Sequence, residues 1–358
     1  MCSLHDLGPR LTDTPPYSSL PPVQKPSHRP RPTPTHPGRS WERVAPGDLG
    51  WSAEKLGAAR AYAATIATDA MMIVVDGHVL DEWGDTGRRF NVHSIRKAFL
   101  SALIGIHAHE GRIHLAATLA DLGIDDNEPT LTDLEKQATV ADLLKARSGV
   151  YHPALYETAT NAAARPARGS YRPGAFWYYN NWDFNTLGTI LERAAGTSLF
   201  EELKTRIADP IGMEDFRVED GVYVRGPDSM HPAYPFGMSA RDMARFGLLY
   251  LRDGQWQGTA VVPRDWIADS TRSHSDLGQK GGYGYMWYVA PAGGPHLTSA
   301  WFPGPVISAQ GFGGHYMVLV PHLDLLVVHR VNTRVEGRQV TESQFGHLMQ
   351  LVLDAAPP

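Results

Sequence analysis

Hydrophobic and polar positions divide the chain into a short polar beginning and a long part with regular apolar patterns. Strands are predicted over residues 71–75, 78–83, 282–289, 316–320 and 325–331. Helices are predicted over residues 52–68, after Asn91, through Leu187 to Gly196, from Ser239, and over 341–353. Asp76-Gly77, between the first two strands, is a strong signal for a two-residue hairpin turn. The helix after Asn91 is apolar on nearly all sides, which is typical of a helix buried in a large domain.

This order of elements, with strands at both ends and helices between them, favours an α+β fold. We expect an antiparallel sheet flanked by terminal helices, with a large inserted helical lobe and a site at their junction. The sheet subdomain is predicted over residues 50–93 and 280–358, and the lobe over 94–279. Together they form one predicted domain, residues 47–358.

Residues 1–46 have a different composition, with many prolines after Thr14. A segment of this kind buries too little apolar surface to offset the entropy of ordering it, so we predict a disordered leader. A polyproline ligand for another domain, with Lys25, Arg29 and Arg31 as its charges, is the alternative interpretation.

The totals exclude several classes of protein. The 358 residues carry a formal net charge of −5, which gives no general attraction to nucleic acid or to anionic membranes. Cys2 is the only cysteine, so no intrachain disulfide forms. No apolar run is long enough to span a bilayer and no secretory signal is visible, which predicts a cytoplasmic protein unless the natural chain begins elsewhere.

Ser94 and Lys97 lie three residues apart at the start of the buried helix, so their side chains share one helix face. Burial and the positive end of the helix lower the pKa of a lysine there, and the neutral amine can accept a proton. A serine hydroxyl needs such an activator to act as a nucleophile. A serine and a lysine three residues apart are common on protein surfaces. Burying a lysine at the start of an all-apolar helix costs free energy, which indicates a functional role.

Two further segments carry candidate chemistry. Tyr179 and Asn181, within Phe176–Trp182, place a phenol and an amide on one loop before a helix. Such aromatic clusters more often serve packing. Gly311-Phe312-Gly313-Gly314-His315 lies at the mouth of a strand, where glycines allow backbone N–H groups to approach an oxyanion. A bulge in an edge strand is the alternative for that segment.

In this order the three segments resemble the serine β-lactamase and penicillin-binding-protein superfamily. The resemblance is greatest to its class C, family VIII esterase and 6-aminohexanoate-dimer hydrolase-like branch. Ser94–Lys97 matches the Ser-x-x-Lys motif of the superfamily, and Tyr179-Asn180-Asn181 matches its Tyr-x-Asn motif. The similarity covers about Trp51 to Leu353 and includes two further segments, Asp142–Gly149 and Ser239–Gly247.

The resemblance implies a serine hydrolase that cleaves an ester or amide through an acyl-enzyme on Ser94. Lys97 and Tyr179 would carry protons, with either one as the base, and no cofactor is implied. Substrate and oxyanion contacts are expected from Asn181, Trp182, Phe312, Gly313 and His315, with the backbone N–H groups of Ser94 and Phe312 as the oxyanion donors.

Two departures from the family pattern limit this prediction. Penicillin-binding members have a lysine or histidine at the third motif, whereas Ala309-Gln310-Gly311 has no cation here, which favours an esterase or amidase over a β-lactamase. Glu157 and Asn161 imitate a class A deacylation motif but precede Tyr179, so no role is assigned to them.

Other functions stay open. The acyl group could pass to an amine or alcohol, as in a transacylase, or the protein could bind ligands without catalysis. A zinc hydrolase is disfavoured because His109, Glu110 and His114 miss the His-Glu-x-x-His spacing by one residue. The absent Gly-x-Ser-x-Gly motif disfavours an α/β-hydrolase. The expected partner is a small ester or amide substrate. The oligomeric state and the substrate's identity are not predicted.

Overall fold

A computed structural model describes residues 35–358, and an antiparallel sheet forms its centre. The eight strands follow the order β2-β1-β14-β13-β12-β11-β10-β9. Their bounds are β1 Ala70–Val75, β2 His78–Gly84, β9 Ser275–Asp276, β10 Gly282–Tyr283, β11 Tyr288–Ala290, β12 Val306–Gly311, β13 His315–Val320 and β14 Leu325–Arg330. Every neighbouring pair is antiparallel, so the predicted sheet is confirmed.

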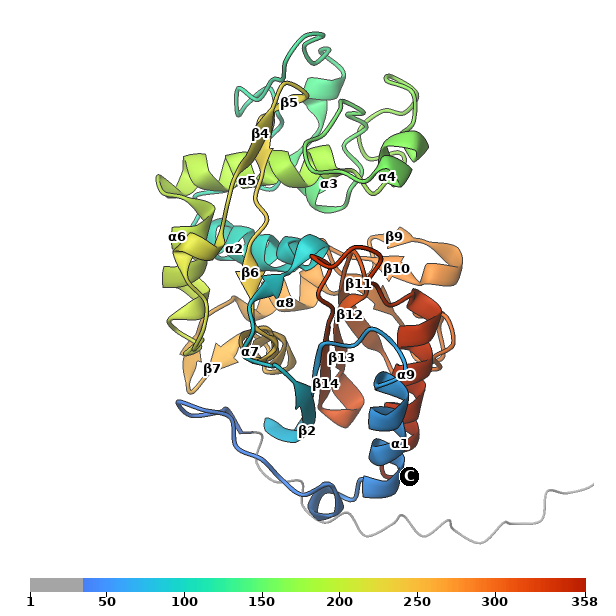
Figure 1. Cartoon of the computed structure of the whole chain (residues 1–358). Helices are drawn as coiled ribbons and strands as arrows, with labels where there is room; N and C mark the ends of the chain where they lie inside the picture. The colour runs from blue at the N-terminus through green and yellow to red at the C-terminus, as the bar shows by residue number, and fades with distance from the viewer. Residues whose placement is uncertain (1–34) are drawn as a thin grey trace, which may run out of the picture. The chain divides into compact units, whose positions relative to one another are not determined.

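Strand β1 shows how the sheet separates two apolar layers. Alternate residues of a strand point to opposite faces, so Met71 and Ile73 pack with one cluster and Met72 and Val74 with the other. The first cluster lies under α1 (Ala53–Ala63) and α9 (Glu342–Asp354), which pack against each other (Figure 1). These are the predicted terminal helices.

The opposite face is covered by helices from the middle of the chain. They are α2 (Arg96–His109), α7 (Ala240–Leu251) and α8 (Arg264–Ser270), and α7 contacts β1, β13 and β14 directly. Helix α2 is buried from Arg96 to His107, as its apolar sequence predicts. Residues 240–270 therefore pack with the sheet, although they fall in the stretch predicted as the inserted lobe.

The lobe proper lies beyond α2 (Figure 1). Its elements are α3 (Val140–Leu144), α4 (Ala159–Ala164), α5 (Asn181–Ala195), α6 (Leu199–Leu203), β4 (Val224–Gly226) and β5 (Ser229–Ala233). The short strands β3 (Phe90–Asn91) and β6 (Gly237–Met238) pair with each other, as do β7 (Gln255–Trp256) and β8 (Thr259–Ala260). Helix α5 ends at Gly196 with a φ of +76°, the left-handed ending that its sequence predicts.

Two sequence predictions differ from the structure. The strand predicted over residues 282–289 is two strands, β10 and β11, joined by a turn. Trp41 Nε1 donates to the Arg241 carbonyl, and Arg245 Nη2 donates to the Gly38 carbonyl. The folded domain thus extends N-terminally from the predicted boundary at residue 47 to at least residue 38. Residues 1–34, which hold most of the predicted leader, lie outside the described residues.

Candidate active site

Ser94 lies in a single turn of helix, η2 (His93–Ile95), directly before α2. His93 has a φ of +49°, and its N–H donates to Asn91 Oδ1 at 2.9 Å, which fixes the chain's entry into this turn. The serine side chain is partly exposed, whereas Ile95 and the residues after it are buried. The hydroxyl therefore lies at the boundary between the protein interior and an open cavity.

The Lys97 amine lies beside this hydroxyl. Nζ donates a hydrogen bond to Ser94 Oγ at 3.0 Å, and the lysine is only 1% exposed. Nζ also lies 4.9 Å from the ring centre of Tyr179 and 5.0 Å from that of Phe184. Burial, and secondarily the charge of Arg96, lower the pKa of Lys97 well below its ordinary value. The amine is thus suited to accept a proton.

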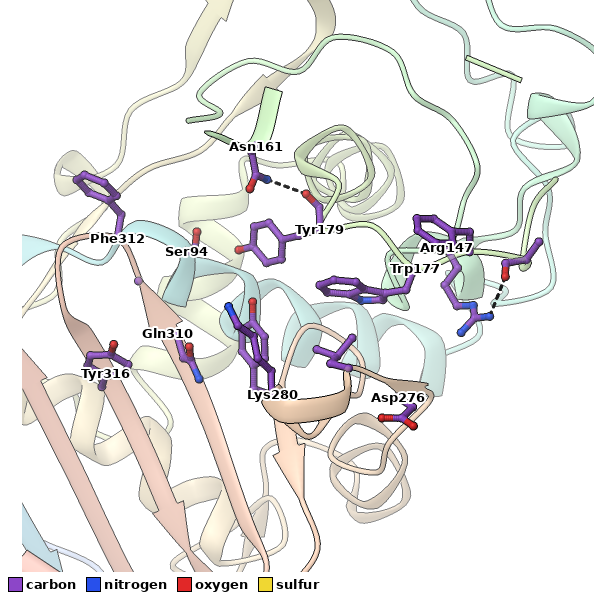
Figure 2. A pocket seen from close by; sticks show the side chains of 15 residues that line it. Ser94, Arg147, Asn161, Trp177, Tyr179, Asp276, Lys280, Gln310, Phe312 and Tyr316 are labelled. Atoms are coloured by element: carbon purple, nitrogen blue, oxygen red, sulfur yellow. Dashed lines mark hydrogen bonds between the residues drawn. The ribbon is translucent and has the colours of Figure 1, made fainter. Parts of the chain in front are cut away.

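Tyr179 reaches the same point from the lobe. It precedes Asn180, the residue that caps α5, and Figure 2 shows its phenol oxygen directed towards Ser94. Burial raises the pKa of Tyr179, while a hydrogen bond with Ser94 and the charge of Arg96 oppose the rise. The phenol is therefore a proton donor at neutral pH. The three residues of the predicted triad are brought together.

The glycine-rich segment forms the turn between β12 and β13, both internal strands, so it is not a bulge in an edge strand. A Cβ on Gly311 would approach the Val92 carbonyl oxygen to 2.8 Å, so this glycine lets the strand end close beside the turn that carries Ser94. Gly313 has a φ of +83°, and a Cβ there would meet Thr333 Cγ2 at 2.3 Å. Phe312, between them, lines the cavity at Ser94 with a side chain that is 57% exposed.

Two predicted wall residues lie elsewhere, and these predictions are corrected. Trp182 is fully buried in the lobe, where Nε1 donates to Asp126 Oδ2 at 2.6 Å. It follows Asn181 on α5, and successive helical residues point in different directions. His315 is also fully buried, and its Nδ1 accepts from Arg330 Nε at 3.0 Å.

Asn181 does line the cavity beside Ser94 and Tyr179, as predicted. Asn181 therefore stands as a wall residue, and its contact with substrate remains a prediction.

Two connected cavities meet at Ser94. The larger has a volume of about 810 Å³ and extends along β12 past Gln310 towards Trp177 and Tyr288 (Figure 2). The smaller, of about 300 Å³, lies between the lobe and η2 and is lined by Tyr156 and Asn181. Ser94, Asn161, Tyr179 and Phe312 line both cavities. A substrate could thus extend in two directions from a bond held at Ser94.

Several site residues were missed by the sequence predictions. Asn161 was assigned no role, yet its Nδ2 donates to the Tyr179 carbonyl at 2.8 Å and so fixes the tyrosine backbone. Arg147 and Lys280 also line the larger cavity, and neither belongs to the third motif. Arg147 lies within the similar segment Asp142–Gly149, but nothing in that segment shows that its side chain faces the cavity.

One histidine near the sequence that disfavours a zinc hydrolase, His107 on α2, pairs with a carboxylate. His107 Nε2 bonds Glu202 Oε2 at 2.8 Å, and residues 35–358 contain no group of three or more histidine, cysteine, aspartate or glutamate side chains arranged to hold a metal ion. In the same residues, no helix combines the length and the apolar character needed to cross a membrane.

The fold is that of the Beta-lactamase-family serine hydrolases, and the comparisons agree. Residues 53–345 match the Beta-lactamase family, and the chain belongs to that family. A Bacillus anthracis protein described as a 6-aminohexanoate-dimer hydrolase is similar in structure, with a TM-score of 0.64, 21% identity and 91% of each chain covered.

Two other solved structures share the fold. An octameric penicillin-binding protein homologue from Pyrococcus abyssi has a TM-score of 0.61 at 19% identity, covering 85% of this chain and 78% of that one. A class C beta-lactamase variant has a TM-score of 0.62 at 16% identity, covering 84% and 95%. Comparison with curated protein sequences gives no match. At these identities the structures support the fold and leave the substrate open.

Proposed function

We propose that the protein is an esterase or amidase that forms an acyl-enzyme on Ser94. The observation that carries this proposal is the 3.0 Å hydrogen bond between Lys97 Nζ and Ser94 Oγ, made by an amine whose pKa burial lowers. When the hydroxyl rotates, the neutral amine accepts its proton, and Ser94 Oγ attacks the carbonyl carbon of the substrate.

The remaining steps use groups around the same point. The backbone N–H groups of Ser94 and Phe312 hold the tetrahedral oxyanion between the helix start and the end of β12. Tyr179 passes a proton to the leaving alcohol or amine as the bond between that group and the carbonyl carbon breaks. Water then attacks the acyl-enzyme, and hydrolysis releases the acid and restores Ser94.

The third motif supports an ester or amide over a β-lactam. Ala309 stands where penicillin-binding members have a cation, and the next residue, Gln310, donates its Nε2 to Ser308 Oγ at 3.1 Å. This amide is held within the sheet and carries no charge to fix a substrate carboxylate. The two directions of the cavity suit an acyl group on one side of the cleaved bond and a leaving group on the other.

The test is intact-mass measurement after incubation with a broad fluorophosphonate, which phosphonylates activated serines. We expect one adduct on the wild type and none on Ser94→Ala. Ser101→Ala is the matched control, because Ser101 lies buried on the same helix and lines neither cavity at Ser94. Unlabelled wild-type enzyme would then be assayed on p-nitrophenyl esters, anilides and a chromogenic cephalosporin. The first two should turn over faster.

Failure of the folded wild type to react, also with a smaller acylating ester, would contradict the catalytic proposal and favour a binding protein. Turnover that yields an acylated amine or alcohol in preference to the free acid would instead establish a transacylase.

A further inference from the structure

Arg96 stands between Ser94 and Lys97 in the sequence, and its burial is unusual for an arginine. The side chain is 1% exposed, and Nη1 donates to the His93 carbonyl at 3.2 Å. Within residues 35–358, Nε and Nη2 form no hydrogen bond of ordinary geometry, although the Tyr234 hydroxyl lies close to the guanidinium, and no carboxylate there forms an ion pair with it. A buried charge without a counter-ion is costly and needs an explanation.

Aromatic rings enclose this guanidinium. Its Cζ lies 5.1 Å from the ring centre of Tyr234 and 5.4 Å from that of Tyr156. Tyr156 is 40% exposed, has a φ of +62° and accepts a hydrogen bond from Asn91 Nδ2 at 2.8 Å. The Tyr156 ring covers much of the guanidinium, although Arg96 also lines the smaller cavity beside Ser94. A positive charge over ring faces and largely out of water is weakly screened.

Most titratable groups facing Arg96 and Lys97 are neutral near pH 7. Burial lowers the pKa of His93 to about 4, with smaller contributions from Arg330, Arg96 and Lys97. Burial also raises the pKa of each of three tyrosines around the site, Tyr179, Tyr234 and Tyr283.

The charged groups nearby do not neutralise Arg96. Glu157 lines the smaller cavity but forms an ion pair with Arg165. Asp183, near the start of α5, accepts hydrogen bonds from Ser148 and Asn180, and burial raises its pKa well above the ordinary value. Arg330 of β14 is a second buried cation.

We propose that Arg96 is a positioning residue whose uncompensated positive charge prepares Ser94, Lys97 and Tyr179 for negative charge. The charge disfavours a second cation on Lys97, so the amine beside Ser94 stays free to accept the serine proton. It also favours the negative charge that develops on Ser94 Oγ and on the oxyanion during attack. Arg96 acts through its neighbours and needs no contact with the substrate. This inference rests on the proposed acyl-enzyme chemistry.

The experiment measures the second-order rate of fluorophosphonate labelling from pH 5 to pH 10 for the wild type and Arg96→Met. A like charge at contact range shifts a pKa by about one unit or more. The pH of half-maximal labelling should therefore rise by about one unit in Arg96→Met, with a roughly tenfold slower rate at pH 7. Arg88→Met is the control, because Arg88 is exposed and packs only on the ring of Phe90. It should keep the wild-type midpoint.

A second pair of variants applies if Arg96→Met does not fold, as circular dichroism and thermal unfolding would show. Tyr156→Ala admits water to the guanidinium and should raise the midpoint, whereas Tyr156→Phe keeps the ring and should leave it unchanged. A wild-type midpoint in folded Arg96→Met, or in Tyr156→Ala when the first variant does not fold, would overturn the inference while the proposed function stands. Absence of any adduct on the wild type would overturn both.

Discussion

Replacing Lys97 with methionine should abolish activity and stabilise the protein at neutral pH. The amine is 1% exposed, lies between the rings of Tyr179 and Phe184, and makes one hydrogen bond, to Ser94. A methionine of similar length places its thioether against the same rings, a favourable contact. It also removes a polar group whose burial costs about 1–3 kcal/mol. Ser94 loses a partner, but its hydroxyl is partly exposed and water can replace the bond.

The sign of the pH dependence follows from the lowered pKa of Lys97. At pH values between the pKa of Lys97 in the folded protein and its pKa in the unfolded chain, the unfolded chain binds one more proton than the folded protein. The contribution of this residue therefore makes the free energy of unfolding rise with pH up to about 10. The advantage of Lys97→Met should therefore be large at pH 7 and shrink as the pH approaches 10.

Calorimetric unfolding at pH 7 and pH 10, beside fluorophosphonate labelling, measures both effects. We expect a Tm increase on the order of 5 °C at pH 7 and no detectable adduct. Lys55→Met is the control, since Lys55 is exposed on α1. A Lys97→Met variant that is less stable than the wild type at pH 7 would refute the claim that burying the Lys97 amine destabilises the folded protein.

Variants at three other positions separate the roles assigned to individual residues. Phe312→Pro removes one oxyanion N–H and should slow ester turnover by about 10²–10³, while Phe312→Ala keeps the N–H and should change the rate little. Asn161→Ala releases the Tyr179 carbonyl and should lower kcat about tenfold with an unchanged Tm, measured by steady-state kinetics and calorimetry. Trp182→Phe breaks the bond to Asp126 and should cost about 1–3 kcal/mol in urea unfolding without slowing Ser94 labelling. A slower labelling rate in Trp182→Phe would contradict the conclusion that Trp182 does not line the cavity at Ser94.

The sequence predicted the elements whose pattern is local. The hairpin at Asp76-Gly77, the buried helix after Asn91 and the ending of α5 at Gly196 each follow from a few neighbouring residues. The strand over residues 282–289 was predicted as one because its apolar run continues through the turn. Turn geometry there depends on tertiary contacts with Ser270. The Tyr285 N–H donates to the Ser270 carbonyl, and a Cβ on Gly284 would meet that oxygen at 2.1 Å.

Site residues were predicted where a motif carries them and missed where only three-dimensional contact does. Ser94 and Lys97 share a helix face by spacing alone, whereas nothing in the sequence near Asn161 shows that α4 folds over the carbonyl of Tyr179. Adjacency to a motif also misled the prediction. Trp182 and His315 follow site residues along the chain, but the direction of each side chain takes it into the interior.

The site itself depends on contact between three parts of the chain that pack on one apolar cluster. Ser94 belongs to the turn before α2, Tyr179 to the lobe, and Phe312 to the turn between β12 and β13. Gly311 lets β12 approach the chain before Ser94, and Asn161 holds the tyrosine carbonyl from the other side. Each reactive group is therefore fixed by a neighbour from a different segment, so small shifts between lobe and sheet would separate the phenol from the serine. Such dependence explains why a site of three short motifs needs a scaffold of more than 250 residues, 53–345, to hold it.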